Sequence, residues 1–318
     1  MRVFVKAPAR LHLGLVDLNG DLGRMFGGLG VAIDQPNVIL ETCKSQMLSV
    51  IGQEAELTRK LANRFLAAFE IKGDVAINVK QAIPAHVGLG SGTQLALAVA
   101  CSISRLYGID ASTDELAVVM GRTAQSGVGT AVFEHGGLVV EAGKNTKDSS
   151  SKNIPLICRQ TFPNEWRFVV AIPQTKKGLA NEAEVSAFKQ LPTMAAGNVG
   201  KICRLTLMKL LPAIVEKDIT SFGEALTQIQ CIVGDSFVQA QGGRYSSSPA
   251  AKCIEFVLEN GAYGAGQSSW GPTVYGIVKS DGAKELQAKT QAFLNDGVGG
   301  NVFVAKASNR GATIKVIK

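Results

Sequence analysis

The sequence predicts an α+β protein of two domains. Segments with alternating apolar and polar residues, typical of strands, are interspersed with segments whose apolar residues recur every three or four positions, as in amphipathic helices. Three glycine-rich loops lie among them, beginning at Ile83, Gly121 and Gly264. Residues 144–153 are polar and include three consecutive serines, so we place the domain boundary there, with domains at residues 1–155 and 156–318.

The first half mixes strands and helices. Alternation predicts strands at residues 2–6, 10–15, 26–33, 37–43, 75–79 and 137–142. Helices are predicted at residues 54–70, 95–107 and 112–121, the first from apolar residues four positions apart. Ser112 and Glu115 form a capping box, in which each side chain caps the other's backbone N–H, and this indicates the start of the third helix.

The second half has a similar mixture of elements. A predicted strand at residues 167–172 precedes helices at 181–190, 197–215, 219–233, 249–260 and 283–294. Pro249 suits the first turn of its helix, where a backbone N–H would be unpaired anyway. The third glycine-rich loop, residues 264–276, runs into a strand, and strands at 301–305 and 312–317 follow.

Composition excludes several classes of protein. The 318 residues are 46% hydrophobic and 19% charged, which supports a large core and argues against disorder. The net charge is +7, but the basic residues are scattered and aromatics are only 6%, so we expect a polyanionic small molecule and no nucleic acid. The six cysteines are far apart, which indicates reduced thiols in a cytoplasmic protein. The N-terminus resembles a strand rather than a signal peptide, and no apolar run reaches about 20 residues, so no membrane contact is expected.

The loop that begins at Ile83 has the composition of a phosphate-binding loop. Its glycines, Gly88, Gly90 and Gly92, let backbone N–H groups converge on an anion, and the helix that follows adds the positive end of its dipole. A flexible turn before a buried helix is the alternative. Two common phosphate loops fit poorly, because no lysine follows Gly92 as in the Walker pattern, and Thr93 stands where a dinucleotide fingerprint has its third glycine.

Three motifs resemble those of the GHMP superfamily, named after galactokinase, homoserine kinase, mevalonate kinase and phosphomevalonate kinase. Its central motif, Pro-x-x-x-Gly-Leu-Gly-Ser-Ser/Gly-x, resembles residues 84–93, Pro-Ala-His-Val-Gly-Leu-Gly-Ser-Gly-Thr. Its N-terminal motif resembles residues 7–14, and its C-terminal glycine motif resembles residues 264–271. The resemblance implies a ribosomal-protein-like N-terminal domain and a ferredoxin-like C-terminal domain, with the central loop wrapped around a ligand's di- or triphosphate.

The second glycine-rich loop departs from the kinases. Many of them carry Ser-Gly-x-Asp there, whose aspartate assists removal of a hydroxyl proton, whereas this chain has Ser126-Gly-Val-Gly129. The chain resembles a non-kinase branch, the β-ribofuranosylaminobenzene 5′-phosphate synthases, at residues 9–19, 23–24, 26–30, 88–94, 126–130 and 133–137. This resemblance implies a pentosyltransferase of methanopterin biosynthesis. Such an enzyme condenses phosphoribosyl pyrophosphate (PRPP) with a para-substituted benzoate, releasing pyrophosphate and CO2 as a C–C glycosidic bond forms.

The implied reaction gives each candidate site residue a role. The predicted ligands of the departing pyrophosphate are Mg²⁺ and Gly88, Gly90, Ser91, Gly92, Thr93 and Gln94. The predicted catalytic residues are Arg10, His12 and Arg24, because arginine suits a planar carboxylate and His12 shares a strand face with Arg10. Asp17 and Glu134 are the predicted metal ligands, and Gln267, Ser268 and Trp270 are the predicted substrate-binding residues.

Structural roles are the alternatives for these side chains. Arg10 and Arg24 could each form a structural salt bridge or be a surface charge, and His12 could have a purely structural role. Asp17 could cap a turn, and Trp270 could pack in the core. Two other functions remain as alternatives: an ATP-dependent small-molecule kinase and a non-catalytic phosphate- or nucleotide-binding protein. Both 4-aminobenzoate and 4-hydroxybenzoate are candidate acceptors, and the family resemblance implies a homodimer.

Overall fold

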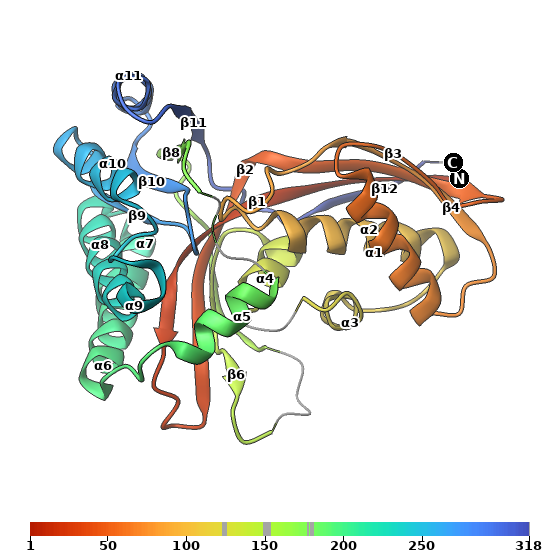
Figure 1. Ribbon diagram of the computed structural model, residues 1–318, viewed down its shortest axis with the longest axis horizontal. Coiled ribbons are helices and arrows are strands. Elements are labelled where there is room, and N and C mark those ends of the chain that lie inside the picture. The colour runs from red at the N-terminus through yellow and green to blue at the C-terminus, as the bar shows by residue number, and fades with distance from the viewer. Residues whose placement is uncertain (123–125, 149–153, 177, 179–180, 318) are drawn as a thin grey trace.

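Two long strands run through the molecule and belong to both of its halves. The computed structural model describes residues 1–122, 126–148, 154–176, 178 and 181–317. The strands β1 (Arg2–Asp17) and β2 (Arg24–Ser45) pair antiparallel along almost their whole length. In Figure 1 they extend from the end that holds both termini to the opposite side of the molecule.

The larger sheet forms around these two strands. Its order is β12-β1-β2-β4-β3, with β3 at Ser49–Gly52, β4 at Asp74–Gln81 and β12 at Thr313–Ile317. Farther along, β2 pairs with β5 (Leu138–Glu141) and β6 (Lys144–Asn145), and β5 pairs with β7 (Leu156–Gln160). The helices α1 (Ala55–Ala68), α2 (Ser91–Tyr107), α3 (Thr113–Val119) and α4 (Val128–His135) cover one face of this sheet (Figure 1).

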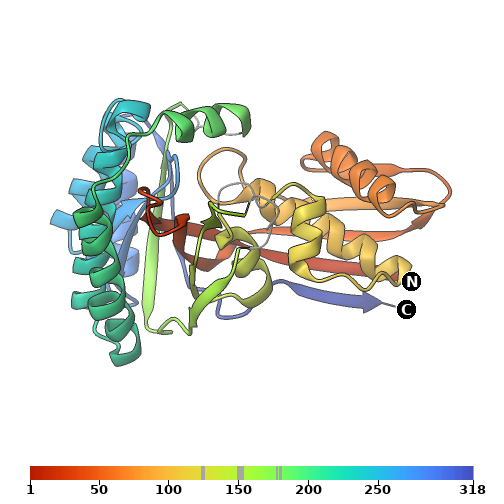
Figure 2. The same ribbon diagram turned by 90° about the horizontal axis from the view of Figure 1, so that it is seen from below.

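Two strands from beyond residue 155 join this first sheet. They are β7 and β12, and β12 pairs with the beginning of β1, which brings the two termini together (Figure 2). The division of the chain at residue 155 stays a prediction.

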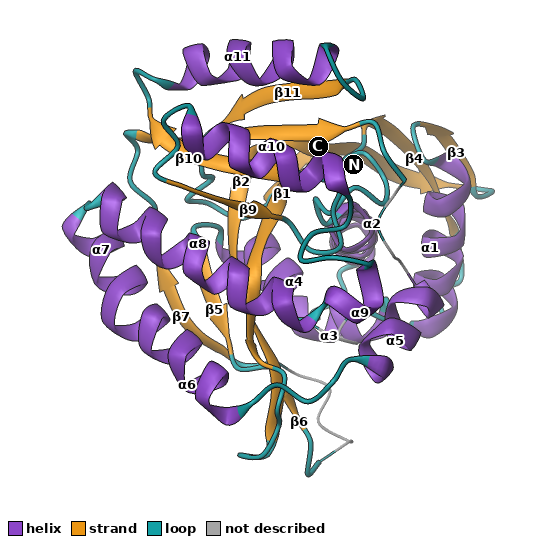
Figure 3. Ribbon diagram, turned by 60° about the vertical axis from the view of Figure 1, so that its left-hand side comes forward, coloured by secondary structure: helices purple, strands orange, loops and turns teal. Residues whose placement is uncertain are grey.

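The second half forms a smaller sheet between two layers of helices. Its order is β11-β8-β10-β9, at Gly300–Ala305, Trp166–Pro173, Val274–Lys279 and Gly264–Gln267. One face packs against α10 (Ser248–Glu259) and α11 (Ala283–Asn295), as Figure 3 shows. The other face packs against α8 (Ile219–Ser236), where Phe222 contacts Trp166. The remaining helices are α5 (Asn181–Gln190), α6 (Ala196–Leu205), α7 (Leu211–Glu216) and α9 (Val238–Gln241).

Alternation along β1 explains how this strand presents polar side chains to a ligand. The side chains of Val5, Leu11 and Leu13 are fully buried in the core. Because successive side chains of a strand point to opposite faces, Arg10 and His12 lie together on the other face, as the sequence predicts.

The predicted α+β fold is confirmed, and the differences concern how the elements join. Residues 2–6 and 10–15 belong to one strand, because the interrupted alternation at Pro8 marks an irregularity in pairing rather than a strand end. Residues 26–33 and 37–43 likewise belong to one strand, β2. The predicted helix at 197–215 consists of α6, a π-helical turn (Thr206–Leu210) and α7.

Six short elements, β3, β6, β7, β9, α4 and α9, do not stand out in the sequence, since each has eight residues or fewer. Residues 123–125 of the second glycine-rich loop and 149–153 of the polar connection lie outside the described residues. Among the helices that the structure describes, none combines the length and apolarity needed to cross a membrane.

Candidate active site

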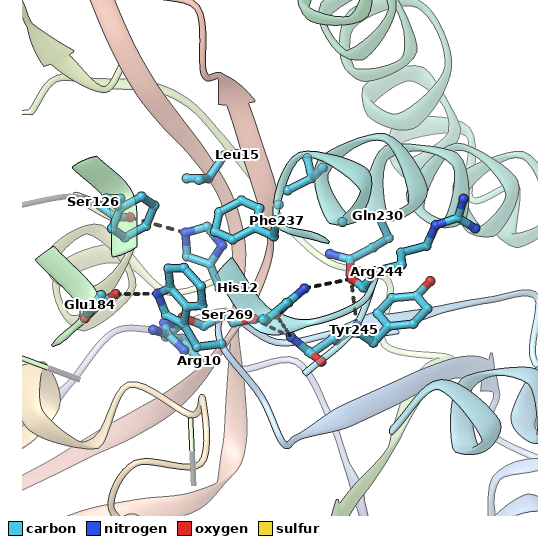
Figure 4. A pocket seen from close by; sticks show the side chains of 17 residues that line it. Arg10, His12, Leu15, Ser126, Glu184, Gln230, Phe237, Arg244, Tyr245 and Ser269 are labelled. Carbon is cyan, nitrogen blue, oxygen red and sulfur yellow. Dashed lines mark hydrogen bonds between the residues drawn. The ribbon is translucent and has the colours of Figure 1, made fainter. Parts of the chain in front are cut away.

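A cleft lies where β1 meets the helices and the third glycine-rich loop of the second half. It spans about 690 Å³, including the solvent-filled space at its mouth, and follows β1 from Arg10 to Leu15. Figure 4 shows side chains that approach it from several elements, including Ser126 near α4, Glu184 on α5 and Gln230 on α8. Residues far apart in the sequence therefore converge on one concave surface, the usual form of a small-molecule site.

The central glycine loop ends at the N-terminus of α2. Gly90 has a φ angle of +80° and precedes the helix without a side-chain cap, so the first helical N–H groups are open to an anion. Ser91 and Gly92 line a separate hollow of about 230 Å³, next to Leu57 and Leu95 of α1 and α2. None of the predicted phosphate-binding residues of the loop lines the larger cleft, as far as the described residues define it.

Arg10 connects the loop to the cleft. Its guanidinium Nη1 donates a hydrogen bond to the carbonyl oxygen of Gly88. A Cβ atom at Gly90 would lie 2.9 Å from the Cγ of Arg10, so the arginine packs directly on the loop. Burial lowers the pKa of Arg10 to about 10, a shift that the carboxylate of Glu184 opposes. Arg10 therefore keeps its positive charge at neutral pH.

His12 lies beside Arg10 on the same face of β1 and also lines the cleft. Its backbone N–H donates to Ser268 Oγ over 2.9 Å, and its Nε2 lies 3.4 Å from Ser126 Oγ. Burial, and secondarily the charge of Arg10, lower the pKa of His12 to about 3. The imidazole is therefore neutral at physiological pH, and it acts as a hydrogen-bonding group rather than as a cation.

The three predicted substrate-binding residues of the third glycine loop lie in different surroundings. Ser268 is fully buried, and its hydroxyl donates to Gly88 O over 2.7 Å, so it holds the central loop in place. Gln267 lines the cleft, and its side chain accepts from Ser246 N and donates to Ser269 O. Trp270 also lines the cleft and donates from its indole Nε1 to Glu184 over 3.1 Å.

Gln94 ties two helices together. Its side chain is fully buried, and Nε2 donates to the carbonyl oxygen of Gly129 over 2.8 Å. A Cβ atom at Gly129 would lie only 2.8 Å from Cγ2 of Thr93, which real Cβ contacts essentially never reach. The Thr93 side chain therefore occupies the space that the aspartate carried by many kinases of this superfamily would need at this position.

Arg24, Asp17 and Glu134 do not line the cleft, as far as the described residues define it. Arg24 donates from Nε and Nη2 to the carbonyl oxygens of Ala142 and Gly143. Asp17 Oδ1 accepts from the backbone N–H groups of the two residues at the turn after β1, so it caps this turn. Glu134 lies near the end of α4 with its side chain 44% exposed. The roles predicted for these residues stay predictions.

Arg122 is a candidate site residue that the sequence analysis misses. Its Nη1 lies 3.2 Å from where a Cβ of Gly92 would stand, so the guanidinium covers the loop at the start of α2. Its Nε is buried and has no hydrogen-bond partner among the described residues. Burial lowers the pKa of Arg122, with Arg64 adding to the shift. Its position directly after Gly121, in the second glycine-rich loop, is the sequence signal that indicates a role at the site.

Three aromatic rings form a wall of the cleft, and the sequence analysis predicts only one of them, Trp270. Phe188, Phe237 and Trp270 line the cleft, and their ring centroids lie 4.8–5.9 Å apart in edge-to-face pairs. Glu184 and Phe188 stand four positions apart on α5, and both face the cleft. This spacing indicates a shared helix face, but the sequence does not reveal that the face lies opposite β1.

We expect that replacing Arg122 by methionine weakens PRPP binding by about 10- to 100-fold, because a hydrogen bond to a charged group contributes about 1.5–3 kcal/mol. Titration calorimetry with PRPP measures this change. Arg204→Met is the matched control, since Arg204 is exposed on α6 and its loss removes the same charge. Equal affinity in the Arg122 variant and the wild type would contradict the assignment of Arg122 to the anion site.

Comparisons with known proteins identify the class to which this fold and loop belong. The model of the GHMP kinases N-terminal domain matches residues 56–137, and that of the GHMP kinases C-terminal domain matches residues 210–296. The homoserine kinase of Cytophaga hutchinsonii has the same fold, with a TM-score of 0.71 and 17% identity over 99% of this chain and 97% of that one. The galactokinase of Lactococcus lactis, solved with galactose, gives a TM-score of 0.72 and 13% identity over 98% and 95%. The chain belongs to the GHMP kinase superfamily.

Comparison with curated relatives shows to which family of this superfamily the chain belongs. The chain is 38% identical to the β-ribofuranosylphenol 5′-phosphate synthase of Archaeoglobus fulgidus over 98% of this chain and 99% of that protein. It is 33% identical to the synthase of the same name from Methanothermobacter thermautotrophicus over 98% of each chain. Within the superfamily, it belongs to the family of β-ribofuranosylphenol 5′-phosphate synthases.

Proposed function

We propose that the protein is a decarboxylating pentosyltransferase of methanopterin biosynthesis. It condenses PRPP with 4-hydroxybenzoate to give β-ribofuranosylphenol 5′-phosphate, pyrophosphate and CO2. The observation that carries this proposal is a single cleft with Arg10 at the anion loop and an aromatic wall beside it. Of the two candidate acceptors, we favour the hydroxy acid because the relatives are named for a phenol product.

The anion end of the cleft suits the pyrophosphate of PRPP. As the bond between the ribose C1′ and pyrophosphate breaks, negative charge accumulates on the leaving group. The open N–H groups of α2, Arg10 and Arg122 would stabilise this charge, because prearranged donors and cations in a partly buried site act most strongly where charge develops.

The aromatic end suits the benzoate. The ring carbon that bears the carboxylate attacks C1′, and the electron pair of the aryl–carboxylate bond then restores the aromatic ring as CO2 leaves. Phe188, Phe237 and Trp270 would hold the flat ring by edge and face contacts and exclude water from the positively charged sugar carbon. Arg10 would meet the carboxylate, because it lines the cleft, whereas Arg24 lies outside it and donates to two backbone carbonyl groups.

A single protein carboxylate would hold Mg²⁺ in this site. The described residues contain no cluster of three or more His, Cys, Asp or Glu side chains that could hold a metal. Mg²⁺ often takes only one or two carboxylates and completes its shell with phosphate oxygens and water. Glu184, which lines the cleft and interacts with Arg10 and Arg122, is the residue that would hold it. When bound, the ion would neutralise charge on the pyrophosphate.

The assay that tests the proposal follows carbon dioxide. We expect purified protein, given Mg²⁺ and PRPP, to release labelled CO2 from carboxyl-labelled 4-hydroxybenzoate. Release from neither this acid nor 4-aminobenzoate would overturn the proposal, and ATP turnover with a metabolite alcohol would favour a kinase instead. PRPP binding without CO2 release would favour a non-catalytic binding protein. The homodimer stays a prediction that sedimentation velocity can test.

Replacing Phe188 by leucine should raise the KM for 4-hydroxybenzoate about 2- to 10-fold, because an aromatic contact contributes about 0.5–1.5 kcal/mol beyond its buried area. The KM for PRPP should stay unchanged. Steady-state kinetics with each substrate varied in turn measures the difference. Phe256→Leu is the control, since Phe256 stacks on Phe293 in the other core cluster, outside the cleft. A rise in the KM for PRPP of the same size would count against the assignment of the aromatic wall to the acceptor.

A further inference from the structure

A buried carboxylate lies directly behind the cleft. Glu141, at the end of β5, is only 2% exposed. Its Oε1 accepts from Gly127 N over 3.1 Å, and its Oε2 accepts from Gly143 N over 2.5 Å. No role described above uses this side chain. Burying an acid is costly unless its charge is well hydrogen-bonded, so its presence calls for a function.

Ser126 joins this carboxylate to the cleft. The serine hydroxyl donates to Glu141 Oε1 over 3.1 Å and lies 3.4 Å from Nε2 of His12. Both Ser126 and His12 line the cleft, and Figure 4 shows the contact between them. A continuous chain of polar atoms therefore runs from the cleft through imidazole and hydroxyl to a buried carboxylate.

The direction of these hydrogen bonds sets the state of the imidazole. Because Ser126 donates its only proton to Glu141, it receives one from Nε2–H of His12. The neutral imidazole is then protonated at Nε2, and its Nδ1 has a free lone pair. Burial raises the pKa of Glu141, which makes its carboxylate a stronger proton acceptor.

The hydrogen-bonded series of His12, Ser126 and Glu141 also lies at a suitable distance from the anion loop. His12 is two residues beyond Arg10 on β1, which places it about 7 Å farther along the strand. In 4-hydroxybenzoate the hydroxyl group stands opposite the carbon that attacks the ribose. With that carbon near the pyrophosphate end, the hydroxyl points along β1, away from Arg10.

We propose that His12, Ser126 and Glu141 form a proton relay that removes the hydroxyl proton of a 4-hydroxybenzoate acceptor and later returns it. This proposal rests on the proposed function and adds a chemical role for the acceptor's hydroxyl group. A phenolate is a far stronger electron donor to the para carbon than a phenol, so its formation promotes attack on C1′.

Each transfer in the relay is balanced. The acceptor's O–H bond breaks as an N–H bond forms at Nδ1 of His12. The Nε2 proton passes to Ser126 Oγ, and the serine's original proton passes to Glu141. His12 changes tautomer but stays neutral, in keeping with its buried position next to Arg10. When CO2 leaves, its electron pair regenerates the phenolate, and the three protons return along the same path.

The test uses acceptors whose hydroxyl groups differ in acidity. The probes are 4-hydroxybenzoate and its 3-fluoro and 3,5-difluoro derivatives, at a pH where the difluoro acid is already a phenolate and the parent is not. We expect Ser126→Ala to lower kcat with 4-hydroxybenzoate about 100-fold, the lower range for loss of general acid–base catalysis. The loss should shrink along the series and nearly vanish with the difluoro acid.

Two variants and one control separate the relay from a structural effect. Ser126→Ala removes the middle link but leaves the two backbone hydrogen bonds of Glu141 in place. Glu141→Gln removes the final acceptor, and its thermal unfolding shows whether the fold survives. Ser308→Ala is the control, because the Ser308 hydroxyl donates to Arg310 O, and neither residue lines the cleft as the described residues define it.

The outcomes distinguish the two proposals. An equal loss of kcat with all three acceptors would overturn the relay and leave the pentosyltransferase in place. A wild-type protein that releases CO2 from none of them would overturn the proposed function and the relay together. A loss that falls with increasing hydroxyl acidity in Ser126→Ala supports the relay, even if Glu141→Gln does not fold.

Discussion

Replacing Arg10 by methionine is expected to lower kcat/KM for PRPP by about 1,000-fold, the largest effect of any single side-chain change in the cleft. Arg10 is half-buried, contacts the loop at Gly88 O and packs against Gly90. It is therefore both a cation for the leaving pyrophosphate and a part of the wall that shapes the loop.

The size of this effect follows from the low polarity around Arg10. Removing one partner of a buried, hydrogen-bonded charge pair costs about 2–5 kcal/mol, because the remaining charge is left without compensation. In the variant, the pyrophosphate would meet methionine carbon atoms where it now meets a guanidinium group. Arg10→Lys should recover only part of the activity, since an ammonium group cannot contact Gly88 O and a phosphate in the same planar arrangement.

Initial rates of CO2 release at varied PRPP concentration measure this prediction. Arg105→Met is the matched control, because Arg105 is exposed near the other end of α2 and its loss changes the net charge equally. A kcat/KM for PRPP within about threefold of wild type in Arg10→Met would show that the anion binds elsewhere, since removing such a donor typically costs at least about 100-fold.

The sequence predicts the fold and the position of the central glycine loop well because both depend on local patterns, while the anion-binding role of the loop stays a prediction. Alternation identifies β1 and its two faces, and the glycines identify the loop before α2. The shared strand face of Arg10 and His12 follows from the same alternation, whereas their catalytic roles stay predictions. The interruption at Pro8 appears as a strand end in the sequence because a pairing irregularity and a strand end look alike without the partner strand.

Residues that join the cleft from distant elements are hidden in the sequence. Glu141 looks like an ordinary strand residue, and only the fold places it behind Ser126. Phe188 lies on α5 and Phe237 lies between α8 and α9, and their rings meet in the cleft. The metal-binding role of Asp17 stays a prediction, and in the structure its Oδ1 caps a turn, as short polar side chains often do.

Replacing Gly90 by valine is expected to weaken PRPP binding by at least about 100-fold, since two unfavourable effects of about 1–3 kcal/mol each act on the same loop. Gly90 has a φ angle of +80°, which a β-branched residue adopts only with strain. The new Cβ would also lie 2.9 Å from Cγ and 3.3 Å from Nε of Arg10. The loop and Arg10 could no longer occupy their present positions together.

This change should act on binding more than on folding. A strained loop can relax by moving away from Arg10 when no ligand is present, but an anion needs both in place, so binding must restore the strained arrangement. Titration calorimetry with PRPP measures the affinity, and thermal unfolding measures the stability.

A matched control separates the two sources of strain at Gly90. Gly108→Val carries a similar backbone cost at a φ angle of +69°, but a Cβ there meets nothing within 4 Å. It should therefore destabilise the fold and leave the affinity for PRPP unchanged. An unchanged affinity in Gly90→Val would refute the assignment of this loop to pyrophosphate. Equal losses of affinity in both variants would attribute the effect to backbone strain rather than to the contact with Arg10.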